Sequence, residues 1–486
     1  YFYHAPSGMV LQDEDLAEYA LSEALKQGAT YAEARLQVNT DKEASLKNGE
    51  VEPLGYGESL GIGMRVMYGK GMAFGATNRL QKDSVIDLAR TLVKNAKSAS
   101  KYFKEKLKMS EEDSFIAKWG AVEEQKLEEI DSSQMIVSLK EMEKEVLSIA
   151  GATSIPFRLF YLSLSVEEKF YVNSQGTRLE SRVPRVSFFG ILTGHQAGNV
   201  VQRAVQMGAS GGWEVYERVR MLERIKEESK TIVDILAKAE KFSSEEMDVI
   251  VGPEVAGIMA HESVGHPSEA DRVLGREAAQ AGESYLVASD IGRQVGSSQA
   301  FISDDPTIPG SSGYYLYDDE GVPARKRRLI VEGRITEFLQ NRETASRFGI
   351  KSNGAARAND YSREPIVRMA NTYVEPGDMR LEEMIRSVKK GVMIKNFMEW
   401  NIDDKRLNQR YVGHESYMIE NGELKGLVKA PVLEITTPRL WSSVAARSKD
   451  LIFDTATCGK GDPMQGIPVW HGGPYMLLKN VKIGAR

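Results

Sequence analysis

Cysteine and histidine are scarce in this chain of 486 residues, which contains one cysteine, Cys458, and six histidines. A single cysteine cannot form an internal disulfide, so a small disulfide-stabilised domain is excluded and a reducing compartment is favoured. No charged-then-apolar leader precedes Met9. We therefore predict that the protein has no signal peptide and is cytoplasmic.

Long hydrophobic runs and an excess of one charge are also lacking. No apolar run approaches the roughly 20 residues that a membrane-spanning helix needs, so we expect no membrane partner. The 63 basic and 69 acidic residues leave a net charge of −6, which argues against nucleic acid as a partner. The basic run 325–328 enters a predicted strand, where it is more typical of a solvated sheet edge than of a nucleic-acid patch.

The periodicity of the apolar residues predicts an N-terminal α/β domain over residues 1–242. Alternating apolar positions over 156–208 predict a β-meander with turns at 173–176 and 194–195. The other elements expected in this domain are helices over 13–27, 84–99, 134–149 and 213–241 and strands over 31–38 and 61–78.

A β-rich catalytic domain with a mainly antiparallel sheet is predicted for residues 246–486. Its first strand covers 247–251, and the turn residues in 331–335 and 419–424 predict hairpins. The fold class expected for the whole chain is therefore α+β.

The densest cluster of chemically reactive residues is the pattern His-Glu-x-x-x-His, formed by His261, Glu262 and His266. Two histidines five residues apart differ by roughly 140° around an unbroken α-helix, so they could not bind one metal ion there. We therefore expect the helix to end between them. Gly265 supplies a permissive backbone, and Pro267 is expected to push His266 out of the helical region.

A catalytic zinc site needs three protein ligands and an open position for water, so a third ligand must come from elsewhere. The candidates are Cys458, His471, His414, Glu269 and Asp271. Cys458 is preferred because it lies in a predicted glycine-flanked loop and because a thiolate ligand leaves zinc able to acidify its water. Glu262 is the natural general base. Glu269 and Asp271 either orient the histidines or begin a surface helix.

The segment 261–271 resembles the HExxxH signature of the TldD subfamily in the TldD/PmbA family of metallopeptidases. The other segments similar to family blocks are 317–323, 369–378, 413–422 and the cysteine block 457–460. Both histidines are retained, as in the active TldD type, whereas the PmbA type lacks the motif. The stretch 400–406 departs from the glycine-rich stretch that relatives often carry. His414 and His471 match no family motif and are expected to be loop histidines.

The resemblance implies that His261, His266 and Cys458 bind zinc and that Glu262 is the catalytic glutamate. It also implies an N-terminal α/β domain followed by a β-rich domain. Members of the family assemble as dimers around an enclosed cavity that admits unfolded peptide. We therefore expect either a homodimer or a heterodimer with a PmbA-type paralogue.

The function predicted from these residues is that of a zinc metallopeptidase, a hydrolase of unfolded or small peptides in which Glu262 moves the proton. An extended substrate would bind by strand addition to a sheet edge near the site. A metal-free alternative uses Cys458 as nucleophile with His471 or His261 as its base. The remaining alternative is a non-catalytic peptide-binding or regulatory subunit of a TldD/PmbA-type complex.

Overall fold

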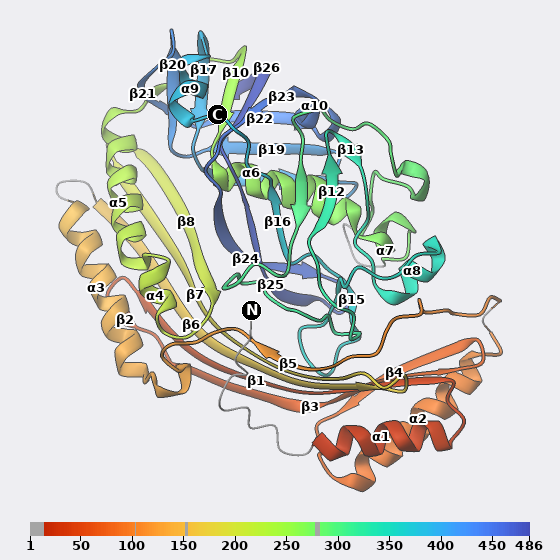
Figure 1. The fold of residues 1–486 in the computed structure, drawn as a ribbon. Helices are drawn as coiled ribbons and strands as arrows, with labels where there is room; N and C mark the ends of the chain where they lie inside the picture. Colours follow the sequence, from red (N-terminus) through yellow and green to blue (C-terminus); the bar gives the residue numbers. More distant parts are fainter. Residues whose placement is uncertain (1–13, 103, 151–153, 278–281) are drawn as a thin grey trace.

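The computed structural model describes residues 14–102, 104–150, 154–277 and 282–486. The N-terminal half forms one long, curved sheet, and the C-terminal half packs against its concave face (Figure 1). The combination of helices with mainly antiparallel sheets confirms the expected α+β fold class. Within the described ranges, no helix is both long and apolar enough to span a membrane.

The curved sheet is built from long, mostly antiparallel strands. They are β1 (Tyr31–Lys47), β2 (Glu50–Val51), β3 (Gly55–Tyr68), β4 (Gly71–Thr77), β5 (Ile116–Gly120), β6 (Ser154–Asn173), β7 (Arg178–Gln196) and β8 (Asn199–Ser210). Their order is β4-β3-β1-β6-β7-β5, with β2 beside β1 and β8 beside β7. The antiparallel pairing of β6, β7 and β8 confirms the predicted meander. The turn predicted at 194–195 is wrong, because β7 continues to Gln196 and the chain reverses at Ala197 and Gly198, which both have positive φ.

Helices cover the two ends of the convex face of this sheet (Figure 1). They are α1 (Glu14–Lys26) and α2 (Lys82–Ala99) at one end, and α3 (Ser132–Ala150), α4 (Val215–Arg218) and α5 (Met221–Lys238) at the other. The single helix predicted over 213–241 is divided into α4 and α5. The reason is Arg220, whose left-handed conformation (φ 54°) interrupts the helical hydrogen bonds.

Two larger sheets and a two-stranded sheet make up the C-terminal half. Their strands are β9 (Glu240–Lys241), β10 (Glu245–Val251), β11 (Ile302–Asp304), β12 (Arg327–Val331), β13 (Arg334–Ile335), β14 (Ala356–Arg357), β15 (Ile366–Val367), β16 (Asn371–Val374), β17 (Lys390–Ile394), β18 (Phe397–Ile402), β19 (Asn408–Gly413), β20 (Ser416–Glu420), β21 (Glu423–Lys429), β22 (Pro431–Thr436), β23 (Val444–Arg447), β24 (Ile452–Lys460), β25 (Gln465–Gly473) and β26 (Met476–Ala485). The ten-stranded sheet has the order β18-β19-β22-β26-β10-β17-β20-β21-β9 with β23 beside β26, and the six-stranded sheet has the order β13-β12-β11-β16-β25-β24. The hairpins predicted at 331–335 and 419–424 are confirmed as β12–β13 and β20–β21.

One buried helix lies between the two larger sheets. The helices of this half are α6 (Pro253–Ala260), α7 (Ala270–Val273), α8 (Arg342–Phe348), α9 (Leu381–Arg386) and α10 (Thr437–Ser443). Every residue of α6 is buried, and the helix packs against β16, β24 and β25. The helix and β25 pack so closely at Gly257 that a Cβ atom there would lie 2.6 Å from the backbone nitrogen of Gly472. The six-stranded sheet therefore fixes α6 along β16, β24 and β25, and the C-terminal end of the helix leads directly into the His-Glu pattern.

The basic run 325–328 is not a solvated edge as predicted. Arg327 is fully buried and forms an ion pair with Asp304 of β11. Its guanidinium also donates a hydrogen bond of 2.6 Å to the carbonyl of Gly354. β12 lies between β11 and β13, inside the sheet, so part of this run is a buried crosslink between strands.

Buried arginines connect the two halves of the molecule, and one of them, Arg203, reaches the start of α6. Arg203 of β8 is 2% exposed, and it forms ion pairs with Glu228 of α5 at 2.9 Å and with Glu254 of α6 at 2.6 Å. It also donates to the carbonyl of Phe397 at 2.8 Å. The curved sheet, its helix α5 and the first turn of α6 therefore share one buried positive charge.

We predict that Arg203→Ala lowers the free energy of unfolding by about 3 kcal/mol, because it leaves the buried carboxylates of Glu228 and Glu254 with only the partly exposed Arg224 as a cationic partner among the described residues. Denaturant titration followed by circular dichroism measures the loss. The matched control is Arg220→Ala, which removes an arginine whose side chain is 66% exposed and whose ion-pair partner among the described residues is the exposed Glu227. The control should lower the free energy of unfolding by about 0–1 kcal/mol. Equal losses in the two variants would contradict the role of Arg203 as a buried crosslink.

Candidate metal centre

The chain leaves α6 through one turn of π-helix, η2 (His261–Gly265), followed by a 3-10 turn, η3 (His266–Ser268). The backbone N–H of His266 donates to the carbonyl of His261, which is the i→i+5 bond of a π-helix. This wider turn brings residues five apart onto one face. The imidazole rings of His261 and His266 accordingly lie 4.9 Å apart, centroid to centroid.

The helix break expected between the histidines is wrong. Gly265 (φ −57°, ψ −63°) and His266 (φ −57°, ψ −46°) both keep helical dihedral angles, although Pro267 follows. Gly265 is required for space rather than for an unusual φ, because a Cβ there would lie 2.0 Å from the sulfur of Met369. One added residue in the turn, and not the end of the helix, aligns the two histidines.

Side chains from distant segments hold the π turn around Ser263. The Ser263 hydroxyl donates to the carbonyl of Met259 at 2.6 Å and accepts a bond of 3.0 Å from the indole N–H of Trp441. The hydroxyl of Tyr285 donates to the Ser263 carbonyl at 3.2 Å. The widened turn therefore depends on hydrogen bonds from distant segments, which no local sequence pattern predicts.

Cys458 meets the two histidines from the opposite side. It lies in strand β24 and not in the predicted loop, and its Sγ is 3.5 Å from Nε2 of His266. One donor atom each from His261, His266 and Cys458 lies within 4.8 Å of the others, and all three residues are buried. Tetrahedral zinc separates a nitrogen and a sulfur ligand by roughly 3.5 Å. These three donors could hold one metal ion and leave a coordination position open.

The electrostatic surroundings favour the protonation states that bind zinc. Burial raises the pKa of Cys458, but His266 and the buried guanidinium of Arg368 outweigh it and lower this pKa to about 7. Burial lowers the pKa of His261 and of His266, which favours the neutral imidazole form that binds a metal ion. The Nδ1 atom of His261 is buried and has no hydrogen-bond partner among the described residues. A neutral imidazole pair beside an acidified thiol fits a zinc ion.

Glu269 orients one of the histidines, which agrees with the first of its two predicted roles. Its Oε2 lies 3.0 Å from Nδ1 of His266, 2.6 Å from Nε of Arg272 and 3.3 Å from Nζ of Lys460. Burial raises the pKa of Glu269, but Lys460, His266 and Arg272 together hold it well below its usual range. The carboxylate keeps the proton of His266 on Nδ1 and leaves Nε2 facing the sulfur. Asp271 pairs with Lys460 at 2.7 Å and bonds to no histidine of the described chain.

Glu262 also lies on the π turn, and its partner is a residue that the sequence did not reveal. Its Oε2 accepts a hydrogen bond from Nη1 of Arg406, and both residues are buried. Arg406 lies in the loop between β18 and β19 in a left-handed conformation (φ 63°). Asp403 fixes this loop by accepting a bond of 2.7 Å from the N–H of Leu407. The stretch 400–406, which departs from the family pattern, thus reaches the site.

His414 is a hydrogen-bonded loop histidine as expected, in the turn between β19 and β20, whereas His471 is not in a loop. His471 lies in β25, is 5% exposed, and has its ring centroid 6.3 Å from that of His261, outside the cluster of three donors. His414 follows β19, is fully buried, and lies 3.3 Å from the amide oxygen of Asn396. Burial lowers the pKa of each to about 3, so both are neutral.

Comparison with known proteins identifies the family. Models described as PmbA/TldA metallopeptidase domain 1, central domain and C-terminal domain match residues 32–96, 125–241 and 244–485. The chain belongs to the PmbA/TldD family. The family membership predicted from the sequence motifs is therefore confirmed.

Relatives in the PmbA/TldD family align over nearly the whole chain. A metalloprotease of Methanocaldococcus jannaschii is 29% identical, and the alignment covers 93% of this chain and 96% of the relative. A zinc metalloprotease TldD homolog of Saccharolobus solfataricus is 25% identical, with 96% and 98% covered. These names support a metallopeptidase.

Solved structures share the fold. The structure of a Thermotoga maritima protein superposes with a TM-score of 0.78 at 16% identity and covers 97% of this chain and 100% of that protein. The structure of TldE from Thermococcus kodakarensis gives a TM-score of 0.73 at 18% identity, with 96% and 100% covered. At such identities the likeness concerns the fold alone.

We predict that Glu269→Gln lowers zinc affinity by about 10–100-fold, because a neutral amide holds the His266 N–H less firmly and leaves Lys460 and Arg272 undercompensated. Competition with a chromogenic chelator measures the affinity. Asp271→Asn is the control, because it removes a carboxylate from the same lysine without touching a histidine. The control should retain its affinity, and similar losses in both variants would show that Glu269 does not act through His266.

We predict that the thiol of metal-free protein titrates near pH 7 and not near the ordinary value of about 8.5. Because Cys458 is the only cysteine, the ultraviolet absorbance of the thiolate reports on this residue alone, with Cys458→Ala as the baseline. The thiolate is the ligand form, so apparent zinc affinity should fall about tenfold for each pH unit below 7. A midpoint at or above 8.5 would contradict the role of His266 and Arg368.

Proposed function

We propose that this chain is a zinc-dependent peptidase that hydrolyses unfolded or small peptides. The observation that carries the proposal is the convergence of His261, His266 and Cys458 directly beside Glu262. Three protein ligands with an open position are the arrangement of a catalytic zinc and not of a closed structural one. The names of the relatives, metalloprotease and zinc metalloprotease, support the same reading.

Each residue has a separate role in the proposed reaction. His261, His266 and Cys458 would hold the metal, which supplies an acidified water and a polarised carbonyl. Glu262 accepts the proton of the water and delivers it to the leaving amine. Arg406 engages Oε2 of Glu262, and no described residue bonds to Oε1, so Oε1 is the oxygen available for the proton.

The position of Cys458 in the sheet supports an extended substrate. β24 is the last strand in the order of the six-stranded sheet, so its outer edge has no strand partner in the described part of the chain. A peptide could add to this edge through backbone hydrogen bonds. Such binding places no demand on side-chain identity and would suit unfolded peptides of varied sequence.

A second candidate is a thiol peptidase in which Cys458 is the nucleophile. The lowered pKa of Cys458 favours it, as does the imidazole of His266 at 3.5 Å. In this mechanism His266 would be the base, because it is the histidine 3.5 Å from the sulfur, whereas the sequence had suggested His471 or His261. A chelator separates the two mechanisms, because it would leave a thiol peptidase active.

Assembly is proposed on the family resemblance alone, and the location is proposed on the single cysteine of the chain. A homodimer, or a heterodimer with a PmbA-type paralogue, in the cytoplasm stays a prediction. The non-catalytic, peptide-binding role also stays open to test, because retained peptide binding without cleavage by zinc-loaded protein would favour it.

We predict about one zinc per chain in the wild type, much less in Cys458→Ala, and full occupancy in Glu262→Gln, as measured by elemental analysis. Glu262→Gln should lower the rate of peptide hydrolysis by at least about 10²-fold, because the amide cannot accept the proton. A chelator should abolish wild-type activity, and added zinc should restore it.

The variant Glu415→Gln is the control, because Glu415 is a buried carboxylate paired with Lys395 at 2.9 Å and is not part of the donor cluster. It should keep both zinc and activity. Full activity in zinc-loaded Glu262→Gln would remove Glu262 as the base, and a wild type that takes up no zinc would overturn the metallopeptidase.

A further inference from the structure

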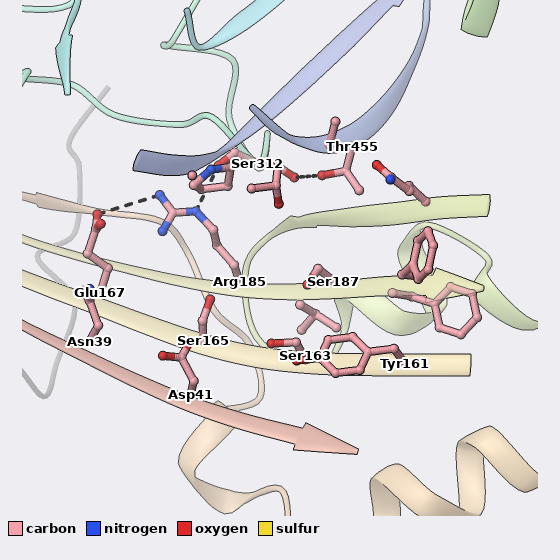
Figure 2. A pocket seen from close by; sticks show the side chains of 18 of the residues that line it. Asn39, Asp41, Tyr161, Ser163, Ser165, Glu167, Arg185, Ser187, Ser312 and Thr455 are labelled. Atoms are coloured by element: carbon pink, nitrogen blue, oxygen red, sulfur yellow. Dashed lines mark hydrogen bonds and ion pairs between the residues drawn. The ribbon is translucent and has the colours of Figure 1, made fainter. Parts of the chain in front are cut away.

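A polar cavity of about 510 Å³ lies between the concave sheet and the strand that carries Cys458. Its walls come from β1, β6, β7 and β8 on one side and from β24 and β25 on the other. Figure 2 shows Arg185, Ser163, Ser165 and Ser187 along the curved sheet, facing Thr455 of β24. Small hydroxyl side chains keep the floor of the cavity open.

The cavity and the candidate metal centre lie on opposite faces of β24. Thr455 and Thr457 line the cavity, and Pro468, the antiparallel partner of Thr457, lines it too. Cys458 is the next residue, and its sulfur faces His266. A chain bound along the free edge of β24 would therefore pass the metal centre and reach the cavity within a residue or two.

Arg185 is a buried cation at this cavity with too few acceptors. The residue is 9% exposed, and its Nε donates to the carbonyl of Ser312 at 2.9 Å. The nearest carboxylate, Glu167, is 3.8 Å from Nη2, which is beyond hydrogen-bond length, and Glu167 is also 3.2 Å from Lys169. Within the described ranges, no other acceptor meets the terminal nitrogens of Arg185.

A second arginine adds to the positive charge at this place. A smaller adjoining cavity shares Glu167, Arg185 and Asn359 of this lining and adds Arg357 together with the ion pair of Lys169 and Asp319. Arg357 is 7% exposed, donates only to the carbonyls of Met369 and Pro468, and has no ion pair with a described carboxylate. The buried amide oxygen of Asn359 likewise lacks a partner within the described part of the chain. Such groups are costly to bury unless a ligand completes their hydrogen bonds.

A carboxyl group on the curved sheet limits the charge of that ligand. Asp41 is the strand partner of Ser165, and Ser165 is the strand partner of Arg185, so Asp41 lies at the same level of the cavity as Arg185. Asp41 lines the cavity without a cationic partner among the described residues, and burial together with Glu43 and Glu167 raises the pKa of Asp41. A polyanion would be repelled there. The lining therefore suits a ligand with one negative end and neutral polar groups behind it.

From these contacts we infer that the cavity is a carboxylate-binding subsite for an extended peptide, with Arg185 as the anion partner and Asn359 as an acceptor for a peptide N–H. The carboxylate comes either from the C-terminus of the peptide or from an acidic side chain. Binding at this subsite does not require that the chain cleave the peptide.

The test is calorimetric binding of N-acetyl-trialanine and of its C-terminal amide to the full wild-type chain, with a chelator present and mass spectrometry confirming intact peptide. The free acid should bind at least about tenfold more tightly than the amide, because the amide loses a charge-assisted pair of hydrogen bonds. Amidated N-acetyl-Ala-Glu-Ala identifies the source of the carboxylate. Binding as tight as that of the free acid would assign a side chain, and weak binding would assign the C-terminus.

Two variants and a control connect the effect to the cavity. Arg185→Gln should remove the difference in affinity between the free acid and the amide, and Arg185→Lys should keep part of this difference. The control is Arg79→Gln, which changes an exposed arginine outside the cavity and should keep the whole difference. Ser187→Phe fills the floor from an exposed position and should block both peptides even if Arg185→Gln does not fold. Equal binding of acid and amide by the wild type, or a preference that survives in Arg185→Gln, would overturn the inference. Because binding is measured, neither result depends on the proposed peptidase activity.

Discussion

The i→i+5 hydrogen bond between His266 and His261 sets the geometry of the candidate metal centre. A regular α-helix would point the two imidazoles in different directions, whereas one π turn brings them onto one face. Such a turn is held in place only by its surroundings. Ser263, Trp441 and Tyr285 supply the hydrogen bonds, and the close packing at Gly265 leaves no room for a side chain. The residues packed around this turn therefore fix the conformation of the His-Glu motif.

Charge balance is the second constraint on this site. His266 and a buried guanidinium lower the pKa of the Cys458 thiol, while burial lowers the pKa of both histidines. Glu269 is fully buried and is compensated by Lys460 and Arg272, so it serves as a fixed acceptor for the His266 N–H. The donors and the groups that orient them therefore form one electrostatic unit, and a change to any one charge affects the others.

Strand β24 joins the two functional regions of the molecule. Successive side chains of this strand point to opposite faces, so Cys458 faces the π turn, whereas Thr455 and Thr457 face the curved sheet. The same strand is the open edge of the six-stranded sheet. The concave face of the N-terminal half thus does more than support the C-terminal half, because it provides one wall of the cavity beside the metal centre. Arg203 holds the two walls together through Glu228 and Glu254.

Elements with local signals were predictable from the residues alone. Apolar periodicity located the helices and the meander, paired turn residues located the hairpins, and residue types together with family blocks selected His261, Glu262, His266 and Cys458. The predictions were wrong where neighbours decide the conformation. Arg220 divides a helix that looked continuous, and the π turn replaces the expected break.

Contacts between distant segments became known from the folded structure. Arg406 reaches Glu262 across 144 positions of the chain, and Arg368 and Lys460 acquire their roles through burial beside Cys458 and Glu269. His414 and His471 became buried neutral groups for the same reason. Residue spacing encodes the period of a helix or a strand, but the contacts between elements depend on how the sheets pack, and a single sequence carries no local signal for that packing.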